Sequence, residues 1–178
     1  MQTPANTGGY QVRTALPAEF EEIGKLMVTV YAQLQGFPSP AEQPAYYEML
    51  AHIGEFTKKP GTELLAAVSP NNTIGGAVVY FSDMKYYGSG GSASEEQDAA
   101  AFRLLAVRDE ARGQGIGKLL TTECISRARA QKVKQVIIHS TMAMQTAWKM
   151  YENLGFKRSS DLDFMQGSLA VYGFRLLL

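Results

Sequence analysis

The chain has 178 residues, of which 46% are hydrophobic and 19% charged, a composition that excludes disordered and fibrous classes and is typical of a globular protein. Its 17 basic and 17 acidic residues give a formal net charge of zero, so no overall field attracts nucleic acid and we expect no such partner. The sequence has no apolar run near the ~18 residues of a membrane span and no N-terminal signal pattern, so we expect a cytoplasmic protein that does not bind membranes.

Hydrophobic periodicity and turn signals predict alternating strands and helices after a flexible tail at residues 1–9. In the first half, the expected elements are a strand at 10–15, helices at 17–34 and 45–56, and a hairpin of strands at 63–69 and 74–81. In the second half, they are a strand at 101–107, a helix at 115–131, a strand at 133–139, a short helix at 145–154, and closing strands at 156–160 and 169–177. We expect residues 10–178 to form one domain.

This order of elements predicts a mixed α/β fold. Most strands follow one another through short turns, which favours a largely antiparallel twisted sheet with helices on both faces. The strands at 101–107 and 133–139 are joined by the helix at 115–131, so we expect them to form a central parallel pair.

Two further segments carry structural rather than chemical signals. Residues 88–98, GSGGSASEEQD, offer little apolar surface, and we expect a flexible loop there. Cys124 is the only cysteine of the chain, and it has neither a disulfide partner nor a metal-ligand spacing. It lies four residues after Leu120 on the same helical stripe, so we expect a buried structural thiol and no metal site.

The sequence ARGQGIGKLL at 111–120 places three glycines directly where the helix at 115–131 must begin. Glycine weakens a helix by roughly 1 kcal/mol relative to alanine, so this density needs a local reason. A helix N-terminus has unpaired N–H groups and a partial positive charge, and missing side chains let a bulky anion approach the backbone. Tight packing at a strand-to-helix turn is the alternative, but it explains one glycine better than three.

Three anion-binding motifs compete for this segment. The dinucleotide fingerprint GxGxxG does not fit, because Gly117 comes one position too early and no acidic residue follows at the ribose distance. The P-loop pattern also fails, because Leu119 follows Lys118 where a serine or threonine is needed, which disfavours a nucleotide-dependent phosphotransferase. The pattern R-x-x-G-x-G is matched by Arg112, Gly115 and Gly117.

This last pattern resembles the pyrophosphate-binding motif of the GNAT superfamily of N-acetyltransferases, which use acetyl-CoA. The context agrees, because a strand ending in LLAV precedes the motif and AWKMYENLGF follows about thirty residues later. That stretch matches the family signature AxxxYxxxGF at Ala147, Tyr151, Gly155 and Phe156. The resemblance covers about residues 101–158, and it implies a GNAT-like fold for the chain.

The resemblance also implies how acetyl-CoA would be held. The backbone N–H groups of Gly113, Gln114, Gly115, Ile116, Gly117 and Lys118 would bind the pyrophosphate, and Arg112 would add charge. The backbone of Leu105, Ala106 and Val107 would pair with the pantetheine arm like a further strand. Met144 stands where many members have asparagine, and Gln145 would take over that contact. A basic run comprising Arg127, Arg129, Lys132 and Lys134 fits a solvated helix face better than an adenosine site.

Acetyl transfer from a thioester to an amine needs an uncharged nucleophile, a stabilised oxyanion and a proton for the thiolate. By the family signature, Tyr151 would supply that proton as the general acid, although its spacing alone fits an apolar stripe. Members place a glutamate at the position of Ala101 or of His139, so His139 is the candidate base or relay. Its ordinary pKa of ~6.5 suits proton removal near neutrality, although a structural histidine is the simpler interpretation.

The acceptor is not fixed by any motif. Seven aromatic and acidic residues are candidates for its pocket: Tyr31, Phe37, Tyr46, Tyr47, Tyr86, Asp161 and Asp163. We expect a small-molecule amine, with a protein amine as the second enzymatic alternative and a non-catalytic CoA-binding sensor as the third. Assembly as a homodimer stays open at this stage.

Overall fold

The computed structural model describes residues 7–178 of the chain, so the predicted tail at 1–9 lies mostly outside the described residues. The strands are β1 (Gln11–Thr14), β2 (Thr62–Val68), β3 (Ile74–Phe81), β4 (Ala99–Val107), β5 (Gln135–Ser140), β6 (Lys157–Arg158), β7 (Phe164–Gln166) and β8 (Leu169–Leu177). The helices are α1 (Phe20–Ala32), α2 (Pro44–Ala51), α3 (Ile116–Gln131) and α4 (Gln145–Asn153).

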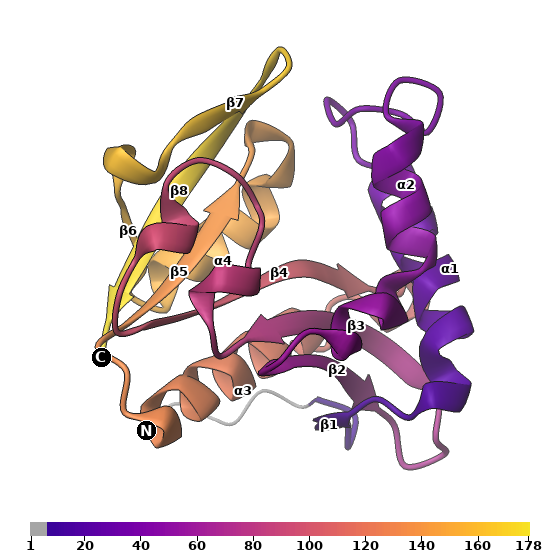
Figure 1. Cartoon of the computed structure of the whole chain (residues 1–178). Helices are drawn as coiled ribbons and strands as arrows, with labels where there is room; N and C mark the ends of the chain where they lie inside the picture. The colour runs from indigo at the N-terminus through magenta and orange to yellow at the C-terminus, as the bar shows by residue number, and fades with distance from the viewer. Residues whose placement is uncertain (1–6) are drawn as a thin grey trace.

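These strands form one sheet in the order β1-β2-β3-β4-β5-β8-β6, with β7 paired to β8. Every pairing is antiparallel except that of β4 with β5, which are joined by α3 and run parallel. Figure 1 shows the β7–β8 hairpin and α2 at the same end of the molecule, with α3 near the opposite end. The predicted mixed α/β class and its parallel pair are confirmed.

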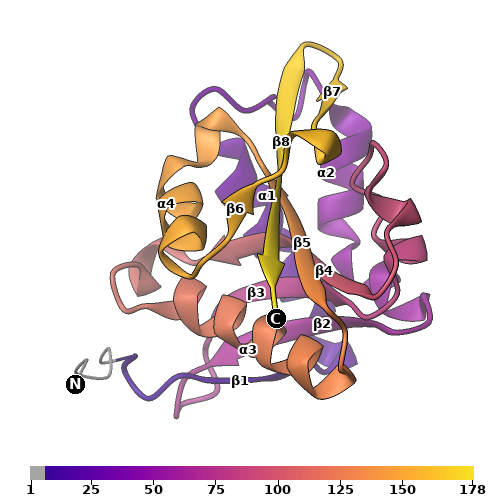
Figure 2. The ribbon, with the colours of Figure 1, turned by 90° about the vertical axis from the view of Figure 1, so that its left-hand side faces the viewer.

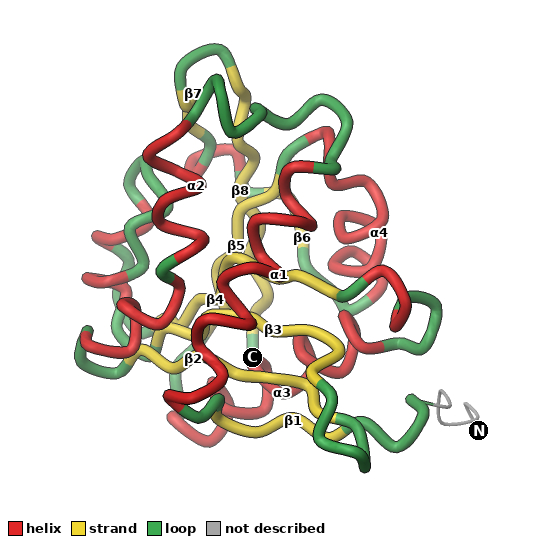
Figure 3. Tube along the Cα trace, turned by 90° about the vertical axis from the view of Figure 1, so that its right-hand side faces the viewer, coloured by secondary structure: helices red, strands yellow, loops and turns green. Residues whose placement is uncertain are grey.

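The sheet is buried on both faces, because successive side chains of a strand point to opposite sides. In β2, Leu64 and Ala66 pack toward α1 and α2, whereas Leu65 and Ala67 pack toward α3 and α4. Figure 3 shows α1 and α2 in front of the strands. In Figure 2, seen from the opposite side, α1 and α2 lie behind the strands, and α3 and α4 lie nearer the viewer. Cys124 belongs to the layer under α3 and is fully buried, and burial raises the pKa of its thiol well above the ordinary value. The prediction of a structural thiol is therefore supported by its position.

β4 and β5 separate after three paired residues, which creates the opening used by the site. The pairing runs from Ala99 with Gln135 to Ala101 with Ile137, and beyond it β4 stays with β3 while β5 stays with β8. Within residues 7–178, no strand pairs with the β5-facing edge of β4 from Phe102 onward. A wedge with unpaired backbone groups on its walls therefore lies between the two strands.

The second predicted helix is shorter than expected. α2 ends at Ala51, and a 3-10 helix, η2 (Ile53–Lys58), continues the segment that was predicted to be helical to Phe56. Residues three apart share one side of a 3-10 helix, and this places Ile53 and Phe56 together in the core at 0% and 6% exposure. Both side chains therefore anchor this 3-10 segment in the core.

The expectation of a flexible loop at 88–98 is corrected by the structure. Ala93 is fully buried within a 3-10 turn, and the Ser92 hydroxyl donates to the carbonyl of Asp161 at 3.3 Å. The carboxylate of Glu96 pairs with Arg175 at 2.7 Å, which ties the loop to β8. The partners that order this loop lie 69 and 79 residues further along the chain, where local sequence gives no signal.

The predicted closing strand at 156–160 is also corrected. Only Lys157 and Arg158 pair with β8 as β6, and a 3-10 turn, η7 (Ser160–Leu162), then leads to β7, which forms the true hairpin with β8. Leu162 in that turn is fully buried, and its burial accounts for the departure of the chain from the sheet edge.

Among the described residues, we find no helix with both the length and the apolar character required to cross a bilayer.

Candidate active site

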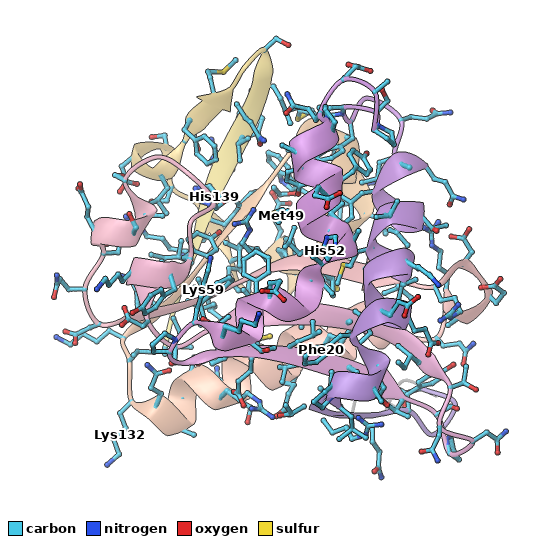
Figure 4. All side chains as sticks on the ribbon, turned by 45° about the vertical axis from the view of Figure 1, so that its right-hand side comes forward. Phe20, Met49, His52, Lys59, Lys132 and His139 are labelled. Carbon is cyan, nitrogen blue, oxygen red and sulfur yellow. The ribbon has the colours of Figure 1, made fainter. Side chains whose placement is uncertain are left out.

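A cavity of about 510 Å³ opens where β4 and β5 diverge. Its walls come from α1, the second half of β4, the start of α3, the end of β5, the first turns of α4, and the β7–β8 hairpin. In Figure 4, His139 lies inward on β5 beside that hairpin, whereas Lys132 projects away from the ribbon at the end of α3. The cavity therefore brings together segments that the sequence analysis treated as separate candidates.

The start of α3 forms one end of the cavity, and its main chain is open there. Gly113 and Gly115 have φ values of +78° and +75°, the left-handed region that favours glycine. The first hydrogen bond of α3 runs from the N–H of Leu119 to the carbonyl of Gly115 at 2.9 Å. The N–H groups of Ile116, Gly117 and Lys118 thus have no acceptor within the helix, and all three residues line the cavity.

Packing does not explain this glycine cluster. A Cβ built on Gly113 would meet nothing within 4 Å, and one on Gly117 would touch only Met150 and Val107 at ordinary distances of 3.7 and 3.8 Å. Arg112 stands beside the loop, largely exposed, and its guanidinium pairs with Asp109 at 3.0 Å. Gln114 does not line the cavity. The loop is therefore an open cradle of N–H groups with a cation at its rim.

The free edge of β4 forms the floor beside this cradle. Leu105 and Val107 line the cavity, whereas the side chain of Ala106 points to the other face and is 2% exposed. The carbonyl of Leu105 accepts a hydrogen bond from the Tyr31 hydroxyl at 3.4 Å, which brings α1 to the edge of the same space. Because the pairing with β5 ends at Ala101, other backbone groups of this edge have no strand partner and are available to a ligand that lies along it.

The Tyr151 hydroxyl reaches the cavity from α4. Its ring packs edge-on against Phe102 and Phe156 with centroid distances of 5.9 and 5.8 Å, which fixes its direction. Burial raises its pKa well above the ordinary value, so the phenol keeps its proton across the physiological range. Among residues 7–178, its hydroxyl has no hydrogen-bond partner, so it is free to donate into the cavity.

His139 also lines the cavity, but both of its ring nitrogens are engaged. Nε2 lies 2.8 Å from the carbonyl of Leu162, which can only accept, so Nε2 carries the hydrogen. Nδ1 therefore accepts from the Tyr87 hydroxyl at 2.8 Å. Burial, together with the positive charge of Arg103, lowers the pKa of His139, and the ring is neutral near pH 7. Ser89 also lines the cavity.

Two buried hydroxyls at the end of β5 lack partners. Ser140 and Thr141 are 2% and 4% exposed, both line the cavity, and neither Oγ nor Oγ1 finds a hydrogen bond within residues 7–178. An unsatisfied buried hydroxyl costs on the order of 1–3 kcal/mol, which a polar ligand group in the cavity would remove. The sequence analysis missed this pair, although polar residues that end a buried strand are a signal for it.

Gln145 and Met144 follow on the same wall. The Gln145 amide lines the cavity and donates to the carbonyl of Met142 at 3.1 Å, so it is partly used within its own turn.

The basic run that comprises Arg127, Arg129, Lys132 and Lys134 does not contribute to the cavity. Its Arg127 pairs with Glu63 and Glu123, and none of its four members lines the cavity.

The predicted acceptor residues divide into two groups. Tyr31, Phe37 and Tyr46 line the cavity and form an aromatic wall with centroid distances of 5.5 to 6.2 Å. The other four candidates do not line it: Tyr47, Tyr86, Asp161 and Asp163. The two aspartates are instead bound to arginines of the sheet edge. The structure adds residues that sequence reasoning missed, namely Ser89, Arg103, Phe164 and Val171.

Comparison with known proteins places this geometry in a family. The family model described as an acetyltransferase (GNAT) domain matches residues 66–172, which is more than half of the chain. A GNAT-family acetyltransferase from Staphylococcus aureus superposes with a TM-score of 0.69 at 14% identity, covering 94% of this chain and 98% of that one. A phosphinothricin acetyltransferase of the GNAT superfamily from Sinorhizobium meliloti, in complex with AcCoA, gives a TM-score of 0.64 at 19% identity, covering 96% and 89%.

A curated relative is similar over a shorter stretch. N-acetylaspartate synthetase from Danio rerio is 30% identical over 69 residues, which is 39% of this chain and 24% of that protein. The match therefore spans about a quarter of the length of that relative.

Proposed function

This chain belongs to the GNAT acetyltransferase family, and from that premise we propose that it transfers an acetyl group from acetyl-CoA to the amine of a small molecule. One observation carries the proposal. The three free N–H groups at the start of α3, the unpaired edge of β4 and the unbonded hydroxyl of Tyr151 all open into one cavity. This combination suits a ligand with a charged diphosphate at one end and a reactive group at the other.

The residues present fit acetyl-CoA. The N–H groups of Ile116, Gly117 and Lys118 would bind the diphosphate, and Arg112 would add a positive charge at the rim. The orphaned hydroxyls of Ser140 and Thr141 would gain polar partners along the arm of the cofactor. Gln114 does not line the cavity, so we assign it no contact with the cofactor. Acetyl-CoA, when bound, supplies an acetyl thioester that an uncharged amine attacks.

Tyr151 would act as the general acid. Its raised pKa keeps a proton on the hydroxyl, and the two aromatic contacts of its ring fix the ring that carries this group. Backbone N–H groups of the free β4 edge near Leu105 and Val107 would stabilise the negative charge that develops on the carbonyl oxygen, a contact worth on the order of 10²-fold in rate.

His139 would take part in proton removal as a relay. Its Nδ1 carries the lone pair and accepts a hydrogen bond from the Tyr87 hydroxyl at 2.8 Å. A proton from the amine would pass through water to the Tyr87 oxygen while the Tyr87 hydrogen moves to Nδ1. Because burial lowers the pKa of His139, this relay works in the neutral form and should fail only at low pH.

The test is release of the free thiol of CoA from acetyl-CoA in the presence of a panel of small amines. We expect turnover with at least one amine and none without an amine. Binding of CoA without release across the panel would favour a CoA-binding sensor, and release only with peptides that carry a free amine would favour a protein substrate.

A further inference from the structure

The partly buried arginines of this protein differ in one respect. Four of them form ion pairs with carboxylates at 2.7 to 3.0 Å: Arg13 with Glu19, Arg108 with Glu22, Arg127 with Glu63, and Arg175 with Glu96. Among residues 7–178, Arg103 is the one partly buried arginine without a carboxylate partner, and it lines the cavity. A guanidinium withdrawn from water is costly unless an anion compensates it.

The surroundings of Arg103 are aromatic and neutral. Nη1 donates to the carbonyl of Tyr87 at 3.1 Å, and Cζ lies 5.8 Å from the ring centroid of Phe56. A guanidinium has five N–H donors in a rigid fork, so several of them stay available to a ligand.

The backbone of β4 aims Arg103 at this position. Leu104 has φ of +61°, and the pairing with β3 shifts between Arg103 and Ala106. The bulge reverses the alternation of the strand, so Arg103 and Leu104 follow each other on the face of α1 and α2. A leucine in the left-handed region costs on the order of 1–3 kcal/mol, and such strain is concentrated at functional sites.

Arg103, Tyr31 and Tyr151 all line the cavity, and burial raises the pKa of the Tyr31 phenol well above its ordinary value. A small molecule can therefore reach both the guanidinium and the group assigned as the general acid.

We propose that Arg103 binds a carboxylate of the acceptor, so that the substrate is an amino acid or a similar small molecule carrying both an amine and a carboxylate. This inference rests on the proposed function and deepens it. The cofactor is a weaker source for the anion, because its diphosphate has its own cradle at the start of α3 with Arg112. The aromatic wall of Tyr31, Phe37 and Tyr46 would cover the apolar part of such an acceptor.

The experiment compares matched acceptors, each an amino acid and the amine left when its carboxylate is removed, such as phenylalanine and phenethylamine or β-alanine and ethylamine. For at least one pair, we expect kcat/KM to favour the carboxylate-bearing member by about 10-fold to 100-fold, as for a charge-assisted bidentate contact. Arg103→Gln should remove this preference, with a much larger loss for the amino acid, through its KM, than for the plain amine, and Arg103→Lys should retain part of it.

Arg108→Gln is the matched control, because Arg108 lies just after the same strand but pairs with Glu22 outside the cavity. Equal use of both members of every pair, equal losses for both in Arg103→Gln, or weaker CoA binding in Arg103→Gln would overturn the inference. If no amine supports thiol release, the proposed function itself fails. Calorimetric binding of the amino acids to the CoA complex of the wild type and of Arg103→Gln then still tests the carboxylate contact, and its absence in the wild type would contradict it.

Discussion

The two ends of the cavity are built from different material. At the start of α3, recognition depends on main-chain N–H groups and on side chains that are missing, as at Gly113 and Gly117. At the opposite end, between α1 and the β7–β8 hairpin, the surface consists of large side chains such as Tyr46 and Phe164 together with Arg103. A main-chain site is constrained to one spacing of residues, whereas a side-chain site can be assembled from any elements that meet.

This difference suggests that the two ends of the cavity bind different ligands. The main-chain end suits a ligand that is the same for every acceptor, because a site made of backbone groups tolerates little variation in the ligand. The side-chain end is suited to selecting one acceptor, because its residues come from separate segments of the chain. The following predictions test each end separately, from the largest expected effect to the smallest.

Tyr151→Phe tests the point where the two ends meet. Removing the hydroxyl should lower turnover by roughly 10-fold to 10³-fold, since no other proton donor replaces it, while the apolar packing of the ring keeps the fold. Thiol release measures turnover, and calorimetry should give unchanged CoA affinity. Tyr172→Phe is the control, because Tyr172 contacts Trp148 outside the cavity. Unchanged kinetics over the whole pH range would remove Tyr151 from the mechanism.

Arg112→Glu tests the main-chain end. Reversing this charge beside the free N–H groups should weaken CoA binding by about 10-fold at low salt and by less at high salt, because an exposed charge is screened. Arg129→Glu provides the comparison, since Arg129 lies exposed in the last turn of the same helix. Equal losses in both variants would mean that net charge, not the cradle, determines affinity.

His139→Gln tests the side-chain end through pH. Burial lowers the pKa of His139 in the folded state, so the unfolded chain binds the proton more readily than the folded one. This residue therefore contributes stability above its unfolded pKa of ~6.5, and that contribution is lost as pH falls through the lower folded value. Glutamine cannot take up the proton, so the variant should lose less stability than the wild type below that pH.

Chemical unfolding from pH 8 to pH 5 measures this difference, with His52→Gln as the control for the exposed second histidine. In Figure 4, the two histidines lie in different parts of the molecule. Parallel stability curves for the wild type and His139→Gln would contradict the buried neutral state. In the same variant, an unaltered acidic limb of the kinetic pH profile would exclude His139 as the relay.

The smallest effect separates two glycines of the cradle. Gly117→Ala should raise stability by up to about 1 kcal/mol, because the helix accepts alanine and its Cβ meets only ordinary contacts. Gly113→Ala should lower stability by a similar amount, on the order of 1 kcal/mol, because φ there is +78°. Thermal unfolding measures both. The same sign of change in the two variants would contradict the different roles assigned to them.

What could be predicted from the sequence follows the same division. The order of strands and helices and the parallel pair could be predicted from hydrophobic periodicity. The glycine cradle could be predicted from the spacing of Gly115 and Gly117. The position of Arg103 in the cavity could not be predicted. It depends on a bulge at Leu104, which has a positive φ, and the sequence has no glycine there to signal such a conformation. The order of the 88–98 loop was also hidden, because its partners Asp161 and Arg175 are distant in the chain.

The most direct test of the central claim, that the open start of α3 and the free edge of β4 hold acetyl-CoA, is isothermal titration calorimetry of the purified, folded protein with CoA. The account predicts saturable binding of one CoA per chain, weakened in Arg112→Glu and kept in Arg103→Gln. Absence of any heat of binding in folded protein would contradict it.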